Sequence, residues 1–353
     1  MSEAAICVVV PVYKAMATLD RCVESVLAQQ VEGGLTCILV DDGSPDESGA
    51  LCDAWAAKDG RVTVIHQDDL GVSGARNSGL AAADSEFIVF LDSDDALRPG
   101  ALQAALTAQR AAPQDFVVWH YTTDEKDPAA VTADAEPRTQ AGLARLWLDC
   151  LLAMPWNKLY RADLAKQLQF DVQYTLGEDL QFVLDYISLL GQTVPEFGYR
   201  VMTSPLTFYD CSRGGTLSTR YHANYCDIWP KHFAKLNAAC HAAACPAEDM
   251  RPLHRAELQV FAEGVADIMR RDPSPTQRLK GYKAEAALRS PWLRALLERM
   301  KIEHCYSAYY LPCRWRNVDL VCRVDEARRA NAPLYGKLDW AGYYLLLGRM
   351  RRD

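Results

Sequence analysis

The first hundred residues alternate between short apolar runs and segments whose apolar residues recur at helical spacing. Residues 5–12 (AICVVVPV) form a near-continuous apolar run rich in valine, which is typical of a strand buried on both faces of a sheet. Strand-like runs follow at residues 35–40, 61–66 and 86–91. Strands that alternate with helices predict βαβ units with right-handed crossovers. The expected fold class is therefore α/β, with a mostly parallel sheet flanked by helices.

Capping residues mark several helix starts. Thr18 can cap a helix over residues 19–27, and residues 44–47 (SPDE) combine a serine cap, a proline at the first helical position and a glutamate at the third. Pro99 can open a helix over residues 99–111.

Three further segments extend this pattern. Residues 116–121 are expected to form a strand. The segment 124–139 is polar, contains two prolines and has no apolar period, which predicts an exposed loop. An amphipathic helix is expected to follow residue 177 and to run through Leu190.

Carboxylates follow two of the predicted strands. Asp41 and Asp42 follow the second, and Asp92, Asp94 and Asp95 follow the fourth. Ligands of open α/β sheets bind beyond the carboxyl ends of the strands. On an extended chain Asp92 and Asp94 would point to the same side, whereas Asp95 would face away. Because no histidine or cysteine is close by, this pair favours a hard cation such as Mg²⁺ or Mn²⁺ over Zn²⁺. The alternative is a solvated loop, or a set of caps for the next helix.

Length and charge divide the chain into two parts. At 353 residues it exceeds the common size of one domain, and we expect a main domain at 1–224 and a helical, basic appendage at 225–353. Residues 1–224 hold 16 Lys and Arg against 31 Asp and Glu, and residues 225–353 hold 22 against 15. The acidic part argues against nucleic-acid binding, whereas the basic part could meet an anionic membrane surface or pair with the acidic domain.

The cysteines indicate a reducing compartment. None of the twelve forms a CxxC pair, and the first four lie in strand-like and helix-like segments, which predicts buried free thiols in a cytosolic protein. The first residues lack the basic start of a signal peptide, and we expect no membrane-spanning stretch.

Six motifs occur in order within the first 182 residues. They are VVVPVYK, VDDGSPD, GVSGARNSGL, FLDSDD, WNKLYRADL and GEDLQF. In this order and spacing they resemble the family 2 glycosyltransferases of the GT-A fold, in particular the bacterial enzymes that build capsule, exopolysaccharide or lipopolysaccharide glycans. The resemblance covers about residues 4–220.

The resemblance implies a role for each matching position. It places the nucleotide at Pro11, Val12, Tyr13, Asp41, Asp42 and Arg76. It assigns the DxD motif to Asp92, Ser93 and Asp94, with Asp94 and Asp92 as the ligands of Mn²⁺ or Mg²⁺. It assigns the catalytic base to Asp179, with Glu178 as the open alternative. It places Trp156, Asn157 and Lys158 near the donor sugar and the acceptor, and Arg213 in a segment that closes on the diphosphate.

The chemistry of sugar transfer explains these residue types. A nucleoside diphosphate leaves with added negative charge, which a divalent ion bridging its phosphates stabilises. The acceptor hydroxyl loses a proton, which a positioned carboxylate can take. One base and no covalent step would invert the anomeric configuration. The expected activity is thus inverting, metal-dependent transfer from a nucleotide sugar, expected to be a UDP-sugar, to a hydroxyl of a glycan or lipid-linked acceptor in cell-surface polysaccharide synthesis.

The end of the appendage carries an amphipathic pattern. Trp340, Tyr343, Tyr344 and Leu347 share one helical face, and arginines follow. This pattern predicts a helix at the membrane interface, and the alternative is a core-packed helix with a basic tail. We expect a cytoplasmic location, either free or at the inner face of the plasma membrane.

Two other functions compete with sugar transfer. A non-catalytic nucleotide-sugar-binding or scaffolding protein would keep the domain without turnover. A sugar nucleotidyltransferase would carry a glycine-rich, basic phosphate loop near its N-terminus, and residues 8–14 (VVVPVYK) contain no glycine.

Overall fold

The computed structural model describes residues 4–174, 176–212 and 220–332. The chain divides into two compact units, Met1–Gly214 and Gly215–Asp353. The domain boundary predicted at residue 224 stays a prediction; the first helix of the second unit begins at Tyr225.

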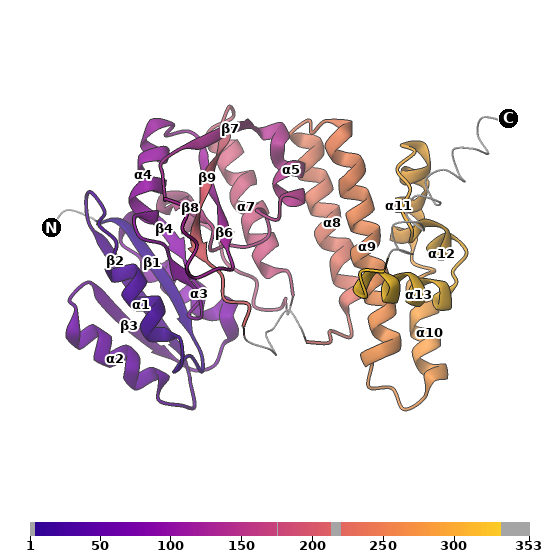
Figure 1. Cartoon of the computed structure of the whole chain (residues 1–353), viewed down its shortest axis with the longest axis horizontal. Coiled ribbons are helices and arrows are strands. Elements are labelled where there is room, and N and C mark those ends of the chain that lie inside the picture. The colour runs from indigo at the N-terminus through magenta and orange to yellow at the C-terminus, as the bar shows by residue number, and fades with distance from the viewer. Residues whose placement is uncertain (1–3, 175, 213–219, 333–353) are drawn as a thin grey trace. The chain divides into compact units, whose positions relative to one another are not determined.

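A nine-stranded sheet forms the centre of the N-terminal unit (Figure 1). Its strands are β1 (Ala4–Val12), β2 (Leu35–Asp42), β3 (Val62–Gln67), β4 (Ser85–Phe90), β5 (Ala96–Leu97), β6 (Phe116–Thr122), β7 (Ala135–Thr139), β8 (Lys158–Arg161) and β9 (Gly198–Phe208). The hydrogen-bonded order is β3, β2, β1, β4, β8, β6, β9, β5, and β7 pairs with β9 outside this path. Strands β1 to β4 are parallel, and β8 runs antiparallel between β4 and β6. The predicted α/β class, a mostly parallel sheet flanked by helices, is confirmed.

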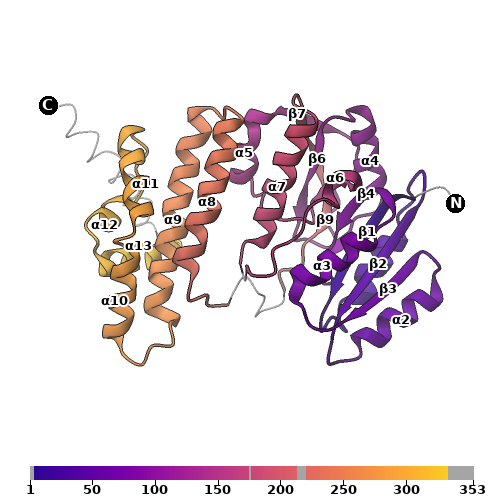
Figure 2. The ribbon, with the colours of Figure 1, turned by 180° about the vertical axis from the view of Figure 1, so that it is seen from behind.

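Helices cover both faces of this sheet. They are α1 (Leu19–Leu27), α2 (Ser48–Lys58), α3 (Gly71–Ala82), α4 (Ala101–Ala111), the 3-10 helix η1 (Gln140–Gly142), α5 (Leu143–Leu148), α6 (Ala162–Ala165) and α7 (Glu178–Thr193). Figure 1 shows α1 and α2 over one face, and Figure 2 shows α3 and α6 over the other. Val8 and Val10 of β1 belong to the core that α1 and α4 complete, whereas Val9 faces Gly79 of α3. The alternation of buried side chains explains why β1 is apolar throughout.

Helix starts differ from the capping predictions. Helix α2 begins at Ser48, and the Ser44 hydroxyl oxygen, predicted to cap it, instead accepts the Lys14 N–H at 3.3 Å. Helix α4 begins at Ala101 after Gly100, whose φ is +79°, so the prediction that Pro99 opens this helix is wrong. Thr18 does precede α1, but its side chain makes no capping hydrogen bond.

The polar segment at 124–139 is not entirely a loop. Its last five residues form β7, which pairs antiparallel with β9. Most of these residues are partly or fully exposed, and Pro137 suits an edge strand because it has no N–H to donate.

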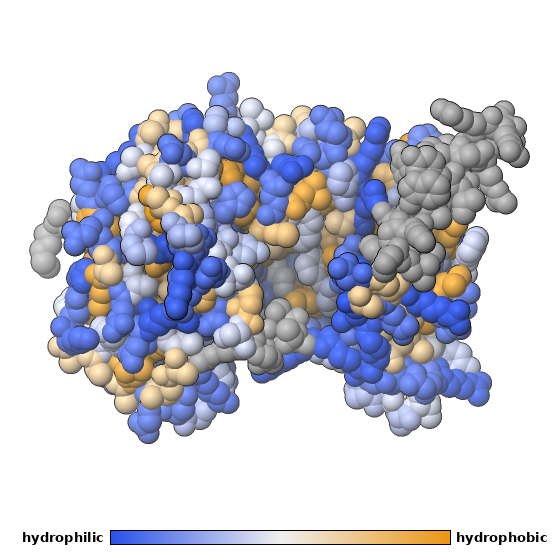
Figure 3. Space-filling view, in the orientation of Figure 1, coloured by the Kyte–Doolittle hydropathy of each residue, from blue (hydrophilic) through white to orange (hydrophobic). Residues whose placement is uncertain are grey.

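The C-terminal unit is helical. Its helices are α8 (Tyr225–Ala242), α9 (Ala247–Arg271), α10 (Gln277–Ala287), α11 (Pro291–Ile302), α12 (Tyr310–Arg314) and α13 (Val318–Arg329). Phe261 and Val265 of α9 pack in one core with Tyr306, Tyr309 and residues of α11 and α13. Helix α10 buries only Ala284, and Figure 3 shows mainly hydrophilic side chains where it lies. Among the described helices, none is both long and apolar enough to cross a membrane.

Candidate functional site

Several loops converge where the strands of the N-terminal unit end. The chain passes from β1 to β2 on one side and returns to β4 on the other, so β1 and β4 frame the point where ligands of such sheets bind. Strands β6 and β9 end at the same edge, and the antiparallel β8 begins there. We call this the carboxyl edge; it comprises Tyr13, Asp41, Asp42, Asp92 to Asp95, Tyr121, Trp156 to Lys158 and Tyr209.

The end of β1 offers one exposed ring. Pro11 and Val12 are buried within the strand, whereas the Tyr13 side chain that follows is 44% exposed. Lys14 has a left-handed φ of 52°, and its ammonium lies 4.9 Å from the centre of the Tyr13 ring. Of the three residues predicted to bind the nucleotide here, Tyr13 can contact a base directly, and Pro11 and Val12 shape the strand beneath it.

Asp41 is held by its neighbours. Its Oδ1 accepts the Ser44 N–H, and its Oδ2 lies 3.0 Å from His66 Nδ1. The other ring nitrogen of His66 lies 2.9 Å from Asp53 Oδ1, and the carboxylates of Asp53 and Asp41 raise the pKa of His66. Burial acts to raise the pKa of Asp41, but its hydrogen bonds with Ser44 and His66 outweigh burial and lower it. Asp41 is therefore an anion already engaged by the protein.

Asp42 fixes the loop that leads to α3. It is 3% exposed, and its Oδ1 accepts hydrogen bonds from Gln67 Nε2 at 2.7 Å and from the Leu70 N–H at 2.9 Å. Gly43 makes this arrangement possible, because its φ is +65° and a Cβ there would lie 3.0 Å from Asp69 N. The structure shows Asp42 in a supporting role, and its contact with a ribose stays a prediction.

The acidic motif forms a turn instead of a continued strand. Strand β4 ends at Phe90, and the Asp95 N–H donates to the Asp92 carbonyl at 3.0 Å. Asp92, Ser93 and Asp94 are partly exposed, whereas Asp95 is fully buried. The turn, and not strand alternation, therefore directs Asp95 inward.

Asp95 is a buried carboxyl group beside two other carboxylates. Its Oδ1 accepts the Asp210 N–H at 3.0 Å, and its Oδ2 has no hydrogen-bond partner in the described chain. Burial, followed by the charge of Asp92, raises its pKa to about 9. Asp95 therefore supports the turn and ties it to the segment after β9.

Arg21 ties the same two segments together from α1. Its Nη2 donates to the Asp94 carbonyl at 2.5 Å and to Asp210 Oδ2 at 2.6 Å. The guanidinium also lies 5.0 Å from the centre of the Phe208 ring. No sequence pattern indicated this role, because Arg21 and Asp210 lie 189 residues apart and in no motif.

Arg76 lies between two carboxylates that the sequence predicts to be functional. Its Nη1 donates to Asp179 Oδ1 at 2.6 Å, and its Nη2 donates to Asp92 Oδ1 at 2.8 Å. The Arg76 side chain is 4% exposed, whereas those of Asp92 and Asp179 are 29% and 30% exposed. The predicted base and the first aspartate of the DxD motif thus belong to one site.

Asp179 lies in the first turn of α7, after Gly177, whose φ is +77°. The positive end of the helix dipole favours an anion at this position. Burial raises the pKa of Asp179 to about 7; the charge of Arg76 opposes this increase, and the charges of Glu178 and Asp92 add to it. A carboxylate with a pKa near neutrality is suited to accept a proton.

Lys158 and Asn157 hold the loop that precedes β8. Both are fully buried, and Lys158 Nζ donates to the carbonyls of Leu151 at 2.7 Å and Met154 at 2.5 Å. Asn157 Nδ2 donates to the carbonyls of Trp119 and Leu151. Burial lowers the pKa of Lys158 well below its usual value. These contacts give Lys158 a supporting role, and its contact with a donor stays a prediction.

Three aromatic side chains meet at the carboxyl edge. Trp156 stacks on Tyr209 with ring centres 5.4 Å apart, and Tyr121 meets Trp156 edge to face at 5.3 Å. Trp156 is 3% exposed, so the two partly exposed tyrosines present this cluster to the surface. Arg213, the remaining predicted donor contact, lies outside the described residues.

Asp92 and Asp94 are suited to a hard divalent cation. Both supply oxygen, both are partly exposed, and both lie in one turn. They provide two protein ligands, so oxygens of a diphosphate and of water would complete the coordination of Mg²⁺ or Mn²⁺.

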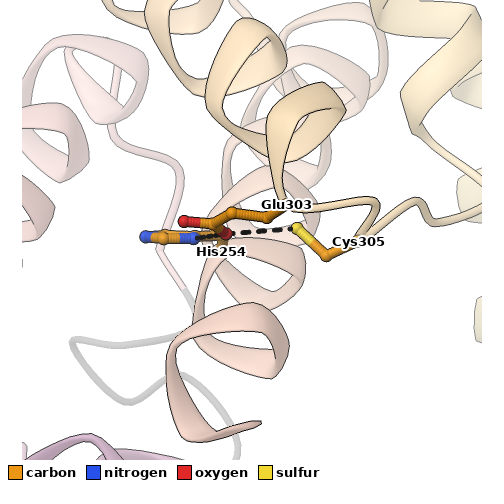
Figure 4. A group of neighbouring side chains, drawn as sticks. All are labelled: His254, Glu303 and Cys305. Carbon is orange, nitrogen blue, oxygen red and sulfur yellow. Dashed lines mark hydrogen bonds and ion pairs between the residues drawn. The ribbon is translucent and has the colours of Figure 1, made fainter. Parts of the chain in front are cut away.

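A group of metal-binding residue types occurs in the C-terminal unit. His254, Glu303 and Cys305 place one ligand atom each within 4.8 Å of one another (Figure 4). His254 Nδ1 lies 2.6 Å from Glu303 Oε2, and its Nε2 lies 3.2 Å from both Arg299 Nη1 and Asn237 Oδ1. Arginine only donates, so the Arg299 contact needs Nε2 as an acceptor and puts the ring proton on Nδ1, toward Glu303; Asn237 Oδ1 also only accepts, so in this tautomer it makes no hydrogen bond with Nε2. A hydrogen-bond network therefore accounts for this group.

Sequence comparisons identify relatives of the N-terminal unit. Residues 7–169 match the model of glycosyl transferase family 2. The chain is 40% identical over 129 residues to the glycosyltransferase GlyG of Streptococcus pneumoniae, covering 36% of this chain and 42% of GlyG. It is 31% identical over 211 residues to the succinoglycan biosynthesis protein ExoO of Rhizobium meliloti, covering 54% of this chain and 58% of ExoO. The chain thus matches about half the length of these curated relatives.

Solved structures share the fold. Staphylococcus aureus TarS in complex with UDP-GlcNAc has a TM-score of 0.61 at 17% identity, over 93% of this chain and 92% of that one. The mannosyltransferase PcManGT from Pyrobaculum calidifontis, in complex with GDP-Man and Mn²⁺, has a TM-score of 0.50 at 17% identity, over 90% and 87%. At such low identity the likeness establishes the fold alone.

Proposed function

We propose that this chain, whose residues 7–169 belong to glycosyl transferase family 2, is an inverting, metal-dependent glycosyltransferase. It moves a sugar from a nucleotide sugar to a hydroxyl of a glycan or lipid-linked glycan during cell-surface polysaccharide synthesis. The observation that carries the proposal is the Arg76 guanidinium, which contacts Asp92 at 2.8 Å and Asp179 at 2.6 Å. The Arg76 guanidinium thus joins Asp92, a carboxylate suited to bind a cation, to Asp179, a carboxylate suited to accept a proton.

Asp94 and Asp92 would hold the divalent ion. Bound there, Mn²⁺ or Mg²⁺ would offset the negative charge that develops on the leaving diphosphate. The Mn²⁺ in the PcManGT complex supports this proposal. Asp95 keeps the turn in place from beneath, through its hydrogen bond from the Asp210 N–H.

Asp179 is the proposed base. It accepts the proton of the acceptor hydroxyl as that oxygen attacks the sugar, and its raised pKa strengthens it for this role. A single base that acts opposite the leaving group inverts the anomeric centre, as in inverting glycosidases. An α-linked donor would therefore yield a β-linked product.

The proposed donor is a UDP-sugar. Tyr13 would contact the base, over a strand end that Pro11, Val12, Asp41 and Asp42 shape. The UDP-GlcNAc in the TarS complex supports UDP as the nucleotide.

The proposed acceptor is a glycan or a lipid-linked glycan. A pocket of about 310 Å³ in the C-terminal unit is lined by apolar residues of α11, by Glu298, which pairs with Arg314 at 3.4 Å, and by four arginines, Arg289, Arg294, Arg314 and Arg316. Arginine suits phosphate, so this pocket supports contact with a phosphate-bearing acceptor or membrane surface. The helix predicted at residues 340–347 lies outside the described residues.

Liposome sedimentation tests the membrane contact. We expect the full chain to sediment with anionic vesicles and a folded variant lacking residues 340–353 to sediment less. Equal partitioning of the two proteins would contradict a role for that segment.

Thermal shift with UDP, GDP, CDP and dTDP, each with and without Mn²⁺, tests the donor class. A ligand that binds only the folded state raises its stability by mass action. We expect a metal-dependent shift with UDP that is absent in folded Asp94→Ala. If no nucleotide shifts the folded wild-type protein, the proposal fails.

The competing functions give different products. A sugar nucleotidyltransferase would release pyrophosphate from UTP and a sugar 1-phosphate, and a scaffolding protein would bind nucleotide sugars without turnover. Release of UDP from a UDP-sugar, lost in Asp179→Asn, would exclude both.

A further inference from the structure

We propose that Arg76 is a positioning residue that competes with the donor's divalent cation for Asp92 while it holds Asp179 in place. This inference rests on the proposed function, and it departs from the nucleotide contact that the sequence resemblance assigns to Arg76. Its basis is that one guanidinium makes an ion pair with each of the two carboxylates.

The protein fixes Arg76 more firmly than its partners. Helix α3 lies so close to the sheet that a Cβ on Gly79 would come within 2.3 Å of Val9 Cγ1. The guanidinium lies 5.4 Å from the centre of the Phe170 ring, and Asn77 binds both the N–H and the carbonyl of Phe170 at 2.8 Å. The ring of Phe170 in turn stacks on Phe182 of α7. Arg76 therefore has a rigid setting, and Asp92 and Asp179 are the groups that can turn.

The Arg76 guanidinium and a divalent ion would compete for the single negative charge of Asp92. In the structure, the Arg76 guanidinium pairs with two carboxylates, and its Nη2 donates a hydrogen bond to Asp92 Oδ1. A divalent ion bound by Asp92 would lie close to the guanidinium, and the two cations would repel each other. Metal binding at Asp92 would therefore weaken its ion pair with Arg76, even where the ion uses the second carboxylate oxygen, and this weakening is a cost in metal affinity.

A weaker pair between Asp92 and Arg76 changes the surroundings of the base. Arg76 would then pair more strongly with Asp179, which favours the ionised form and the orientation fixed by the 2.6 Å contact. Donor loading would thus prepare the base before the acceptor arrives. The reaction should follow an ordered sequence in which the nucleotide sugar binds first.

Metal affinity measured without turnover tests this inference. The free Mn²⁺ signal in electron paramagnetic resonance gives the dissociation constant in the presence of UDP for wild type, Arg76→Gln and Arg76→Lys. We expect Arg76→Gln to bind Mn²⁺ at least roughly fivefold more tightly, which is the lower range of coupling between sites. The Mn²⁺ dissociation constant of Arg76→Lys should lie between those of wild type and Arg76→Gln, because an ammonium keeps the charge but cannot bridge two carboxylates as a guanidinium does.

The pH profile of kcat/KM provides the second readout. Without Arg76 the carboxylate of Asp179 loses its cation, so the acidic limb should move up by about one pH unit and the rate should fall. If Arg76 had only a structural role, Arg76→Gln would weaken Mn²⁺ binding and leave the acidic limb of the kcat/KM profile at the same pH. Arg61→Gln is the matched control, since Arg61 pairs with Asp59 just before β3, at the opposite edge of the sheet.

The outcomes separate this inference from the proposed function. If wild type binds Mn²⁺ with UDP and turns over, but Arg76→Gln binds Mn²⁺ equally or less tightly, the inference alone is overturned. Weaker UDP binding in Arg76→Gln with unchanged Mn²⁺ affinity would indicate that Arg76 contacts the nucleotide, as the sequence resemblance implies. If wild type neither binds Mn²⁺ nor turns over, both fail. If Arg76→Gln does not fold, Arg76→Lys tests the inference instead, and Mn²⁺ binding tighter than in wild type is again the expected result.

Discussion

Replacing Asp179 by asparagine should nearly abolish transfer and leave donor binding intact. The proposed base has a pKa of about 7. A base works when ionised, so activity is present above this pKa and is lost as the pH falls through it. The ionised fraction is roughly 0.1 at pH 6 and roughly 0.9 at pH 8, and kcat/KM of wild type should therefore rise about ninefold between them. The variant should lose about 10²- to 10⁴-fold in rate and show no such limb.

The assay is UDP release from UDP-GlcNAc, UDP-glucose and UDP-galactose in the presence of Mn²⁺ and an acceptor extract, with UDP binding measured separately by thermal shift. Glu178→Gln is the matched control, because Glu178 is the adjacent carboxylate and its charge helps to raise the pKa of Asp179. This control should keep its turnover, and its acidic limb should move to lower pH. Wild-type turnover in Asp179→Asn, or loss of turnover confined to Glu178→Gln, would refute the assignment.

Three more substitutions test other parts of the site. Asp94→Ala should remove the Mn²⁺-dependent stabilisation by UDP, which would reach about 2.7 kcal/mol at a ligand concentration 100 times Kd; a normal thermal shift would exclude Asp94 as a ligand. Lys158→Met leaves the Met154 carbonyl and Asn157 Oδ1 without the donor that Lys158 supplies, so urea unfolding should show a loss of roughly 2–5 kcal/mol. Lost UDP binding in the folded variant would instead place Lys158 at the donor. Arg21→Gln breaks the ion pair with Asp210, and since Arg21 is 30% exposed we expect a loss of only about 1–2 kcal/mol, with weaker UDP binding. Unchanged stability and binding would show that this tie is dispensable.

The parallel half of the sheet was predictable because its strands are apolar on both faces and alternate with helices. The other half was not. Strand β8 has four residues, Lys158 to Arg161, and becomes a strand only because β4 and β6 flank it. Strand β7 is polar and lies at an edge, so its residues carry no apolar period. Strand formation of this kind depends on neighbours that are distant in sequence.

Motifs located the charged residues of the site, but not how they are connected. Asp92 and Asp179 stand in recognisable segments, yet the guanidinium that joins them belongs to a residue 103 positions before Asp179. Local patterns can also compete: Ser44 looks like a helix cap, but its hydroxyl oxygen accepts the Lys14 N–H and the helix starts at Ser48. Polar residues of this type bond to nearby backbone in several alternative ways, and tertiary structure selects among them.

The direction of β8 has a consequence for engineering this chain. A parallel strand brings the loop that follows it to the carboxyl edge, whereas an antiparallel strand brings the loop that precedes it, which is why Trp156 stands before its strand and Asp92 after. The loops at the opposite edge, before Leu35 and before Val62, carry none of the proposed chemistry. Gly60 is exposed, and a Cβ there would meet nothing within 4 Å. Peptide tags or new chain termini belong in these loops, since exposed loop tips tolerate insertion and permutation best.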